Sequence, residues 1–503
     1  MCEAPDETQF MTKKPSIITT ERKCMKCEEN AVLVIRIDDA FCRNCFVHYM
    51  THKFRSAIGK GRLILYDEKV LLAYSGGHSS CAMLHLVQQG FLEHVHKKLR
   101  FFPHLVHIDE GAVTNQDLEE RLCDYKEITS KLQSTGIPYD VVYLERVMSL
   151  DSEQLTKKPA NSTIENCSGT KKEGDASGSY KDGSENKLEG VRKTSGPVSD
   201  DSSTTEGCPC DRDMSNGMES LDINGLAGSL KKLLESAKTL TTKEDLLWQL
   251  RHQLLIEVAR QRGCTKIMLA DSGTLVSIRI LANIAQGRGA ALPLDTGFVD
   301  GRHGDINFVR PLKEFTKKEI VLYNKFHDVK STFIPSLTTK VGSGASINLL
   351  TEEFVNALQE GFPSTISTIC RTGEKLGTEG NSSQNKCLIC KAPLDTSVPQ
   401  ASALNATNFS LSLSSTCKRT MSSKQPSSDD QCCGEGDGGC HGNTVNKIDM
   451  KDIEGLLCYG CRVTIRDVTD LNLLPSQIKA EVEKTIRRSK MKEEIEDFLL
   501  PDD

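Results

Sequence analysis

Eight cysteines stand in pairs at CxxC spacing, a pattern typical of metal-binding thiolates. Cys24 and Cys27 are followed, after about a hairpin's length of chain, by Cys42 and Cys45. A CxxC turn places two sulfurs close enough to share one ion, and two such turns complete a tetrahedral four-cysteine zinc site. The sequence therefore predicts a structural zinc module over residues 20–62, with four unligated thiols as the alternative.

A second set of four cysteines is split along the chain. It consists of Cys387 and Cys390, followed much later by Cys458 and Cys461. Closing so long a loop is tolerable because its entropic cost grows only logarithmically with length. We predict a second zinc module over residues 380–470. The alternatives are unligated thiols, a redox pair, iron–sulfur ligation, or ligands shared with Cys432, Cys433 or Cys440.

A basic stretch follows the first cysteine module. No acidic residue stands between Phe41 and Tyr66, and aromatic residues are interleaved with the bases. Basic side chains neutralise phosphates, and exposed aromatic rings stack on nucleobases. A solvated basic helix whose aromatics face the zinc core is the alternative. The residues predicted to bind RNA are Arg43, Lys53, Arg55, Lys60 and Arg62.

A glycine turn lies where a buried strand runs into a helix. Val70–Tyr74 is apolar, and Ser75-Gly76-Gly77 opens the helical stretch that follows. Glycine lets backbone amides approach a ligand, and a helix N-terminus favours an anion. The pattern lacks the Gly-Lys-Ser/Thr of a Walker loop. It predicts a phosphate cradle, with a plain tight turn as the alternative. The cradle residues are Ser75, Gly76, Gly77, Ser79 and Ser80.

Strand-like and helix-like stretches alternate on both sides of a long polar segment. Short apolar runs at Val70–Tyr74, Leu105–Ile108, Tyr139–Leu144 and Lys266–Ala270 are separated by helical patterns. This order predicts an α/β fold with a doubly wound, mostly parallel sheet. Its two halves span residues 63–150 and 241–370.

Two segments are too polar to bury a core. Residues 151–240 and 397–445 are rich in Ser and Gly, so we predict that both are disordered insertions. The first carries 16 acids and 12 bases, which makes it a main source of the formal charge of −6. An amphipathic helix is predicted over residues 474–500, docked on its own core.

The composition indicates a soluble intracellular protein. The 503 residues are 38% apolar with one tryptophan, and no apolar run is long enough to cross a membrane. The N-terminus lacks the basic and apolar regions of a secretory signal. A cytoplasmic location is therefore expected, where thiols stay reduced and CxxC pairs bind metals.

The glycine turn resembles the Ser-Gly-Gly-x-x-Ser signature of the PP-loop N-type ATP pyrophosphatases. Within that superfamily, His107-Ile108-Asp109-Glu110-Gly111 and Arg310-Pro311-Leu312 resemble motifs of the tRNA 2-thiolation ATPases. The flanking cysteine modules match their layout as well. The resemblance implies the nucleotide fold, a nucleotide site that includes Asp109, and ATP with Mg²⁺ bound through a complex.

The sequence departs from the active members of that family. Their loop Lys-Asp is His78-Ser79 here, and their sulfur-handling cysteines have no counterpart at Thr242–Arg251 or at Ser331–Ser336. The resemblance then implies a non-catalytic subunit of a complex that makes 2-thiouridine at the wobble position of the tRNAs for lysine, glutamate and glutamine.

That subunit is expected to pair with an active thiolation ATPase paralogue, to bind tRNA and to use sulfur from a thiocarboxylated ubiquitin-related modifier. Two alternatives stay open at this point. One is an active ATP-dependent thiolase with Cys81 or Cys264 as sulfur carrier. The other is a zinc-dependent RNA-binding adaptor outside thiolation.

Overall fold

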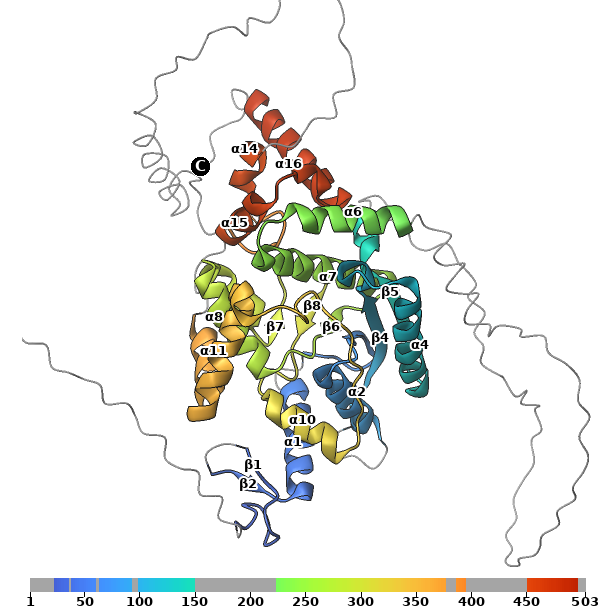
Figure 1. The fold of residues 1–503 in the computed structure, drawn as a ribbon, viewed down its shortest axis with the longest axis vertical. Coiled ribbons are helices and arrows are strands. Elements are labelled where there is room, and N and C mark those ends of the chain that lie inside the picture. Colours follow the sequence, from blue (N-terminus) through green and yellow to red (C-terminus); the bar gives the residue numbers. More distant parts are fainter. Residues whose placement is uncertain are drawn as a thin grey trace, which may run out of the picture. The chain divides into compact units, whose positions relative to one another are not determined.

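A six-stranded sheet organises the protein (Figure 1). The computed structural model describes residues 22–35, 38–59, 63–92, 98–149, 223–376, 386–394 and 450–495. The strand order is β5-β4-β3-β6-β8-β7; only β7 is antiparallel to its neighbour. This confirms the predicted doubly wound, mostly parallel sheet. The strands are β3 (Glu68–Ala73), β4 (Phe101–Asp109), β5 (Tyr139–Tyr143), β6 (Lys266–Met268), β7 (Val299–Asp300) and β8 (Asn307–Val309).

Helices bury both faces of the sheet. On β3, Val70 and Leu72 pack into one core cluster and Leu71 into another, because successive side chains point to opposite faces. The first cluster includes apolar residues of α2 (His78–Phe91), α4 (Leu118–Ser134) and α10 (Lys317–Phe326). The second includes those of α6 (Ile223–Ser236) and α7 (Leu240–Arg262). Strands buried on both sides explain the continuous apolar runs of the sequence.

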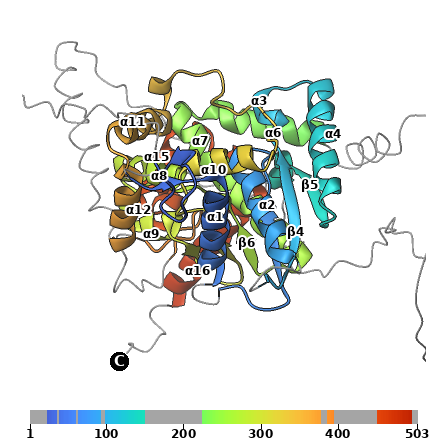
Figure 2. The same ribbon diagram turned by 90° about the horizontal axis from the view of Figure 1, so that it is seen from below.

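A third, smaller cluster joins four helices. They are α8 (Gly273–Ala285), α9 (Leu292–Thr296), α11 (Ile347–Gly361) and α12 (Thr365–Lys375). Figure 2 shows α11 and α12 on the side of the sheet opposite to α4. The short elements between the main ones are α3 (Gly111–Thr114), η1 (Leu144–Ser149), η2 (Gly289–Ala291) and η3 (Ser343–Ala345).

Side chains fix where several helices begin. Asp117 and Glu120 form a reciprocal capping box at the start of α4, and Thr316 and Glu319 do so at α10. Each box satisfies backbone amides that the first helical turn leaves without acceptors. At α8 the hydroxyl of Ser272 accepts from the amide of Leu275. The sequence thus sets the residues at which these three helices begin.

The two cysteine modules flank this α/β unit in the sequence. The N-terminal module contains β1 (Leu33–Val34), β2 (Ala40–Phe41) and α1 (Arg43–Gly59). The C-terminal module joins residues 386–394 to a helical segment. That segment comprises α14 (Met450–Ile453), η5 (Glu454–Leu456), α15 (Tyr459–Asp467), η6 (Leu471–Leu473) and α16 (Ser476–Ile495).

The sequence placed the end of the first insertion too far along the chain. Residues 151–222 of the first predicted insertion and all of the second, 397–445, lie outside the described residues, but residues 223–236 form α6. Leu230, Leu233 and Leu234 of that helix are buried in the core. Their helical spacing was hidden among the Ser, Gly and Lys residues that precede them. Within the described ranges, no helix is both long and apolar enough to cross a membrane.

Candidate functional site

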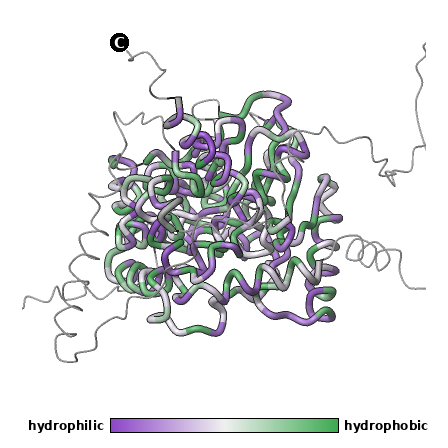
Figure 3. Tube along the Cα trace, turned by 90° about the horizontal axis from the view of Figure 1, so that it is seen from above, coloured by the Kyte–Doolittle hydropathy of each residue, from purple (hydrophilic) through white to green (hydrophobic). Residues whose placement is uncertain are grey.

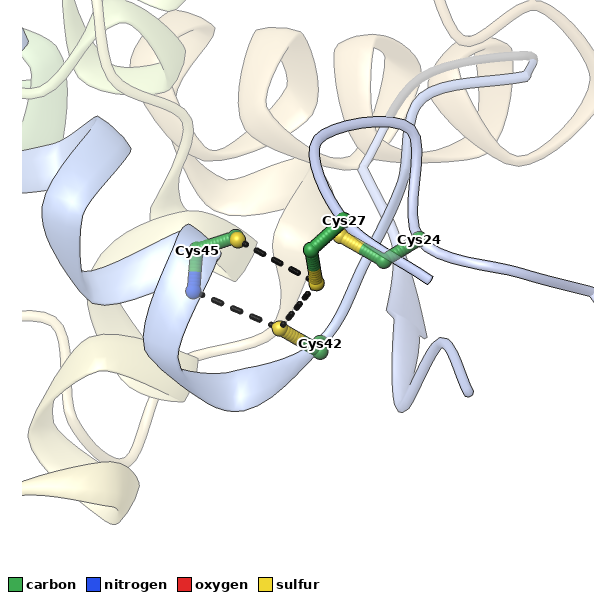
Figure 4. Close-up of side chains that lie close together, drawn as sticks. All are labelled: Cys24, Cys27, Cys42 and Cys45. Carbon is green, nitrogen blue, oxygen red and sulfur yellow. Dashed lines mark hydrogen bonds between the residues drawn. The ribbon is translucent and has the colours of Figure 1, made fainter. Parts of the chain in front are cut away.

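The first four cysteines converge on one point (Figure 4). Cys24 and Cys27 lie on a turn before β1, and Cys42 and Cys45 lie at the start of α1. The sulfur of Cys27 lies 3.6 Å from that of Cys42 and 3.6 Å from that of Cys45, and all four lie within 4.8 Å of one another. Tetrahedral ligation at ~2.3 Å would set the sulfurs about 3.8 Å apart. The cluster therefore fits a single ion.

Backbone amides donate hydrogen bonds to two of these sulfurs and favour the thiolate at Cys24. The amide of Lys26 donates to Cys24 Sγ at 3.4 Å, and that of Cys45 donates to Cys42 Sγ at 3.5 Å. Burial raises the pKa of the Cys24 thiol, but the surrounding backbone amides, led by that of Cys42, outweigh it and lower the pKa to about 6. The thiolate is the form that binds metal.

The second four cysteines are also brought together, although Cys390 and Cys458 stand 68 positions apart in the chain. Cys387 and Cys390 lie on the turn of residues 386–394, Cys458 caps α15 and Cys461 lies in its first turn. The sulfurs of Cys390 and Cys458 are 3.6 Å apart, and all four are within 4.8 Å of one another. Both predicted four-cysteine sets can therefore hold a metal ion.

The glycine turn lies at the carboxyl end of β3. Chain order reverses here, because β4 lies on one side of β3 and β6 on the other. Doubly wound sheets bind ligands in the crevice at such a switch point. Gly76 has φ +76°, and a Cβ there would stand 3.0 Å from Ile128 Cδ1 of α4. The turn therefore requires glycine at this position.

Hydrogen bonds tie the turn to its surroundings. The hydroxyls of Ser75 and Ser80 lie 3.3 Å apart, and Ser80 Oγ donates to the carbonyl of Gly77. The carbonyl of Gly76 accepts from the amide of Thr332 at 2.8 Å. The loop after α10 thus closes over the turn. Ser75, Gly76 and Gly77 form this turn, and Ser79 and Ser80 lie in the first turn of α2.

Asp109 stands at the end of β4, next to β3, and is bound within the protein. Its carboxylate accepts from the amide of Gly111 at 2.7 Å and forms an ion pair with Arg121 at 3.1 Å. Arg121 also pairs with Glu145, which is fully buried. Burial raises the pKa of Glu145, although Arg121 opposes this rise. Arg121 therefore balances the buried negative charge of this corner.

An ion-paired cluster beyond β6 was not predicted from the sequence. Asp271, which follows β6, binds Arg279 of α8 at 2.9 Å and Arg310, which follows β8, at 3.1 Å. Arg310 is fully buried and also donates to the carbonyl of Gly297. Only the neighbouring placement of β6 and β8 brings these groups together. The arginine of the Arg-Pro-Leu motif is thus engaged with its own chain.

Two of the predicted RNA-binding residues form hydrogen bonds within the protein. Arg43 donates to the carbonyl of Phe326, and Lys53 donates to that of Glu314 at 2.8 Å. These contacts fasten α1 to both ends of α10. Arg55 lies half-buried on α1, whereas Lys60 and Arg62 lie outside the described residues.

The fold and the site define a PP-loop-like protein with two cysteine modules, because a glycine turn at the switch point of a doubly wound sheet is combined with two four-cysteine clusters. The family model described as "Cytoplasmic tRNA 2-thiolation protein 2" matches residues 346–463. Full-length relatives carry the same name. The protein 2-A of Xenopus laevis is 41% identical over 95% of this chain and 94% of its own length. The relative from Danio rerio is 40% identical over 100% of both chains.

The Homo sapiens relative of that name is 38% identical over 96% of this chain and 94% of its own. The chain therefore belongs to the cytoplasmic tRNA 2-thiolation protein 2 family, which confirms the resemblance seen in the sequence. The cytoplasmic location expected from the sequence agrees with the names of these relatives. A solved structure of the U34-tRNA thiolase NcsA from Methanococcus maripaludis, with its [4Fe-4S] cluster, superposes with a TM-score of 0.44. It covers 72% of this chain and 89% of that one at 15% identity.

Proposed function

We propose that this chain is a non-catalytic subunit of a heteromeric tRNA sulfurtransferase. The complex would form 2-thiouridine at wobble position 34 of the tRNAs for lysine, glutamate and glutamine. Its active subunit would be a thiolation ATPase paralogue, and a thiocarboxylated ubiquitin-related modifier would donate the sulfur. The observation that carries the proposal is the placement of the thiols outside the two four-cysteine clusters.

Cys81, next to the glycine turn, is held inside the protein. Its sulfur donates to the carbonyl of Gly76 at 3.2 Å and lies 3.4 Å from the hydroxyl of Tyr74. Burial raises the pKa of this thiol. A sulfur carrier must be an accessible thiolate, so Cys81 is suited to packing and not to transfer.

Cys264 lies near the amino ends of the central strands, whereas the glycine turn lies at their carboxyl ends. β6 runs parallel to β3 with Val70 opposite Lys266, so Cys264 is level with Glu68, at the amino end of β3. The glycine turn begins at Ser75, about 23 Å along the strand at ~3.3 Å per residue. Burial raises the pKa of this thiol as well. Neither candidate carrier of the active-thiolase alternative is therefore suitable.

The two other described thiols do not replace them. Cys370 of α12 is buried and donates to the carbonyl of Gly273, and burial raises its pKa to about 11. Cys123 is exposed on α4, but the residue of α4 that packs on the glycine turn is Ile128. No described thiol thus combines proximity to the turn with a thiolate state.

The surroundings of the glycine turn also support a subunit that does not adenylate tRNA with ATP. Adenylation needs cations against the phosphates and a carboxylate for Mg²⁺, and His78 and Ser79 provide neither as Lys-Asp would. The nearby carboxylates are already paired, Asp109 with Arg121 and Asp271 with Arg279 and Arg310. The turn is therefore proposed to be a vestige of a nucleotide site that retains at most weak phosphate binding.

Zinc is the metal that we propose for both clusters. Four cysteine thiolates close a tetrahedral site and leave no open position, so the ion would be structural. A four-iron cluster bound by four cysteines would place each thiolate on a different iron and spread the sulfurs farther apart than one ion does. Sulfurs 3.6 Å apart favour the single ion.

A reconstituted thiolation assay tests the proposal. Unmodified tRNA, ATP and the sulfur donor are incubated with this chain, with the active paralogue, or with both. We expect 2-thiouridine only when both are present, and C81A and C264A variants should support wild-type yields. Product from this chain alone, or ATP–pyrophosphate exchange by it, would establish the active-thiolase alternative. Normal wobble thiolation in cells that lack the chain would indicate the adaptor outside thiolation.

A further inference from the structure

The second half of α16 carries a basic face that the proposed function has not used. Lys484, Arg487, Arg488 and Lys490 are all exposed, and in the described ranges none of them forms an ion pair. In the sequence, Glu483 stands directly before this stretch, and Glu493 and Glu494 follow it. Figure 3 shows mostly hydrophilic colour where α16 leads into the C-terminal trace. A chain with a formal charge of −6 thus gathers four cations between Lys484 and Lys490.

The helix turns three of these four cations away from the core. Ile478, Val482 and Ile486 pack into the core cluster that contains α7. At about 100° per residue, Lys484, Arg487 and Arg488 project on the opposite side of α16. The sequence predicted that the helix docks on its own core, and its apolar side does so. The basic side is left facing solvent.

The spacing of the charges fits a nucleic-acid backbone. Lys484 to Lys490 covers about 9 Å of helix axis at ~1.5 Å per residue. One strand of a duplex presents a phosphate every ~3.4 Å of axis, so about three phosphates lie alongside that length. Lysine and arginine at such spacing position a backbone without reading its bases.

We infer that this face of α16 binds the phosphate backbone of RNA. The inference rests on the proposed function, in which tRNA is the substrate, and it moves the expected contact from α1 to α16. On α1, Arg43 and Lys53 are already committed to carbonyls of their own chain. The four cations of α16 have no such partner in the described structure.

The second cysteine cluster holds this face in place. Val482 of α16 is buried in the same core cluster as Cys387 and Cys461. Lys391, which directly follows Cys390, forms an ion pair with Glu481. A metal ion bound at this cluster would therefore hold the base of the helix that presents the cations.

Equilibrium binding of unmodified tRNA to the full chain, alone and with its thiolase partner, tests the inference. The test variant is R487Q/R488Q, because glutamine keeps the helix propensity of arginine. The matched control is K231Q/K232Q, which removes two exposed lysines from α6. Loss of two phosphate contacts should weaken binding about 15- to 30-fold at ~0.15 M salt and make the slope of log K against log salt shallower by about 1.4 to 1.8. The control should bind as wild type.

The outcomes separate the inference from the function beneath it. Wild-type affinity and slope in R487Q/R488Q, with tRNA bound by the unaltered chain, would overturn only the α16 site. An equal loss in K231Q/K232Q would show a general charge effect and overturn it too. If R487Q/R488Q no longer binds the thiolase partner but still binds tRNA as the unaltered chain does, the face is a protein-docking surface and the inference fails. If the unaltered chain binds no tRNA, either alone or with its thiolase partner, the proposed function fails as well.

Discussion

Lys53 of α1 donates to the backbone carbonyl of Glu314, 261 residues away, at 2.8 Å. The same ammonium donates to the hydroxyl of Tyr49 and lies 4.6 Å from the centre of the Phe315 ring. Lys53 therefore provides a hydrogen-bond donor for the carbonyl just before α10, and it joins the N-terminal cysteine module to the α/β unit. A residue that looks like a phosphate ligand in the sequence works as a connection between two parts of the fold.

Replacing Lys53 should accordingly destabilise the protein. K53M keeps the apolar stem but removes a charged hydrogen bond and a cation–π contact, a loss of about 1.5–3 kcal/mol. R55M changes the same charge two positions along, where no hydrogen bond is made to α10, and should cost less than about 0.5 kcal/mol. Denaturant unfolding measures both values. Equal stabilities of the two variants would contradict the role given to Lys53.

Metal content should report two independent sites. C27S and C387S should each reduce the zinc content from two ions per chain to one, because each removes one of four ligands from a closed site. C123S, which alters an exposed thiol on α4, should retain two. Elemental analysis of the purified protein gives the ratios. Iron in place of zinc, or two ions retained in C387S, would refute the assignment of the second cluster.

How much of this could be predicted depended on whether the signal was local. Val70–Tyr74 and the glycine turn are contiguous, and both were found where the sequence placed them. The CxxC pairs were equally readable, because ligand spacing within a pair is fixed by one turn. Helix α6 was not, since its buried leucines follow a polar stretch that dominates the local composition.

Contacts between distant segments could not be predicted. The pairing of Asp271 with Arg310 exists because β6 and β8 are neighbours, and the sequence does not state strand order. The partners of Arg43 and Lys53 lie on and before α10, far along the chain. The sequence does not show that Arg43 and Lys53 are hydrogen-bonded to these carbonyls, whereas Lys484, Arg487, Arg488 and Lys490 of α16 are exposed and form no ion pair within the described residues.

Two glycines with left-handed backbones separate the cost of a steric contact from the cost of backbone strain. Gly76 and Gly136 have φ values of +76° and +67°, but a Cβ at Gly136 would meet nothing within 4 Å. G136A should cost only the strain of the left-handed backbone, about 1 kcal/mol. G76A adds the contact with Ile128 and should cost about 1–3 kcal/mol more. Unfolding free energies of the two variants decide this, and equal losses would show that the turn is not closely packed.

Acid should destabilise the fold partly through Asp140 at the start of β5. Burial raises the pKa of this carboxyl, but hydrogen bonds from His104, at 2.8 Å, and Arg262 outweigh it and lower the pKa below its ordinary value. A carboxyl with a lowered folded pKa stabilises the protein above its unfolded pKa, and this contribution is lost as the pH falls through the folded value.

Wild-type stability should therefore decrease from about pH 5 downward more steeply than that of D140N. D140N should be less stable at about pH 7, because it loses the charged partner of Arg262, and the two curves should converge in acid. D38N alters a highly exposed carboxylate that pairs only loosely with Arg22 and should follow the wild-type curve. Unfolding free energies measured from about pH 7 to about pH 3 test this. Parallel curves for D140N and wild type would show that Asp140 has no lowered pKa in the folded state.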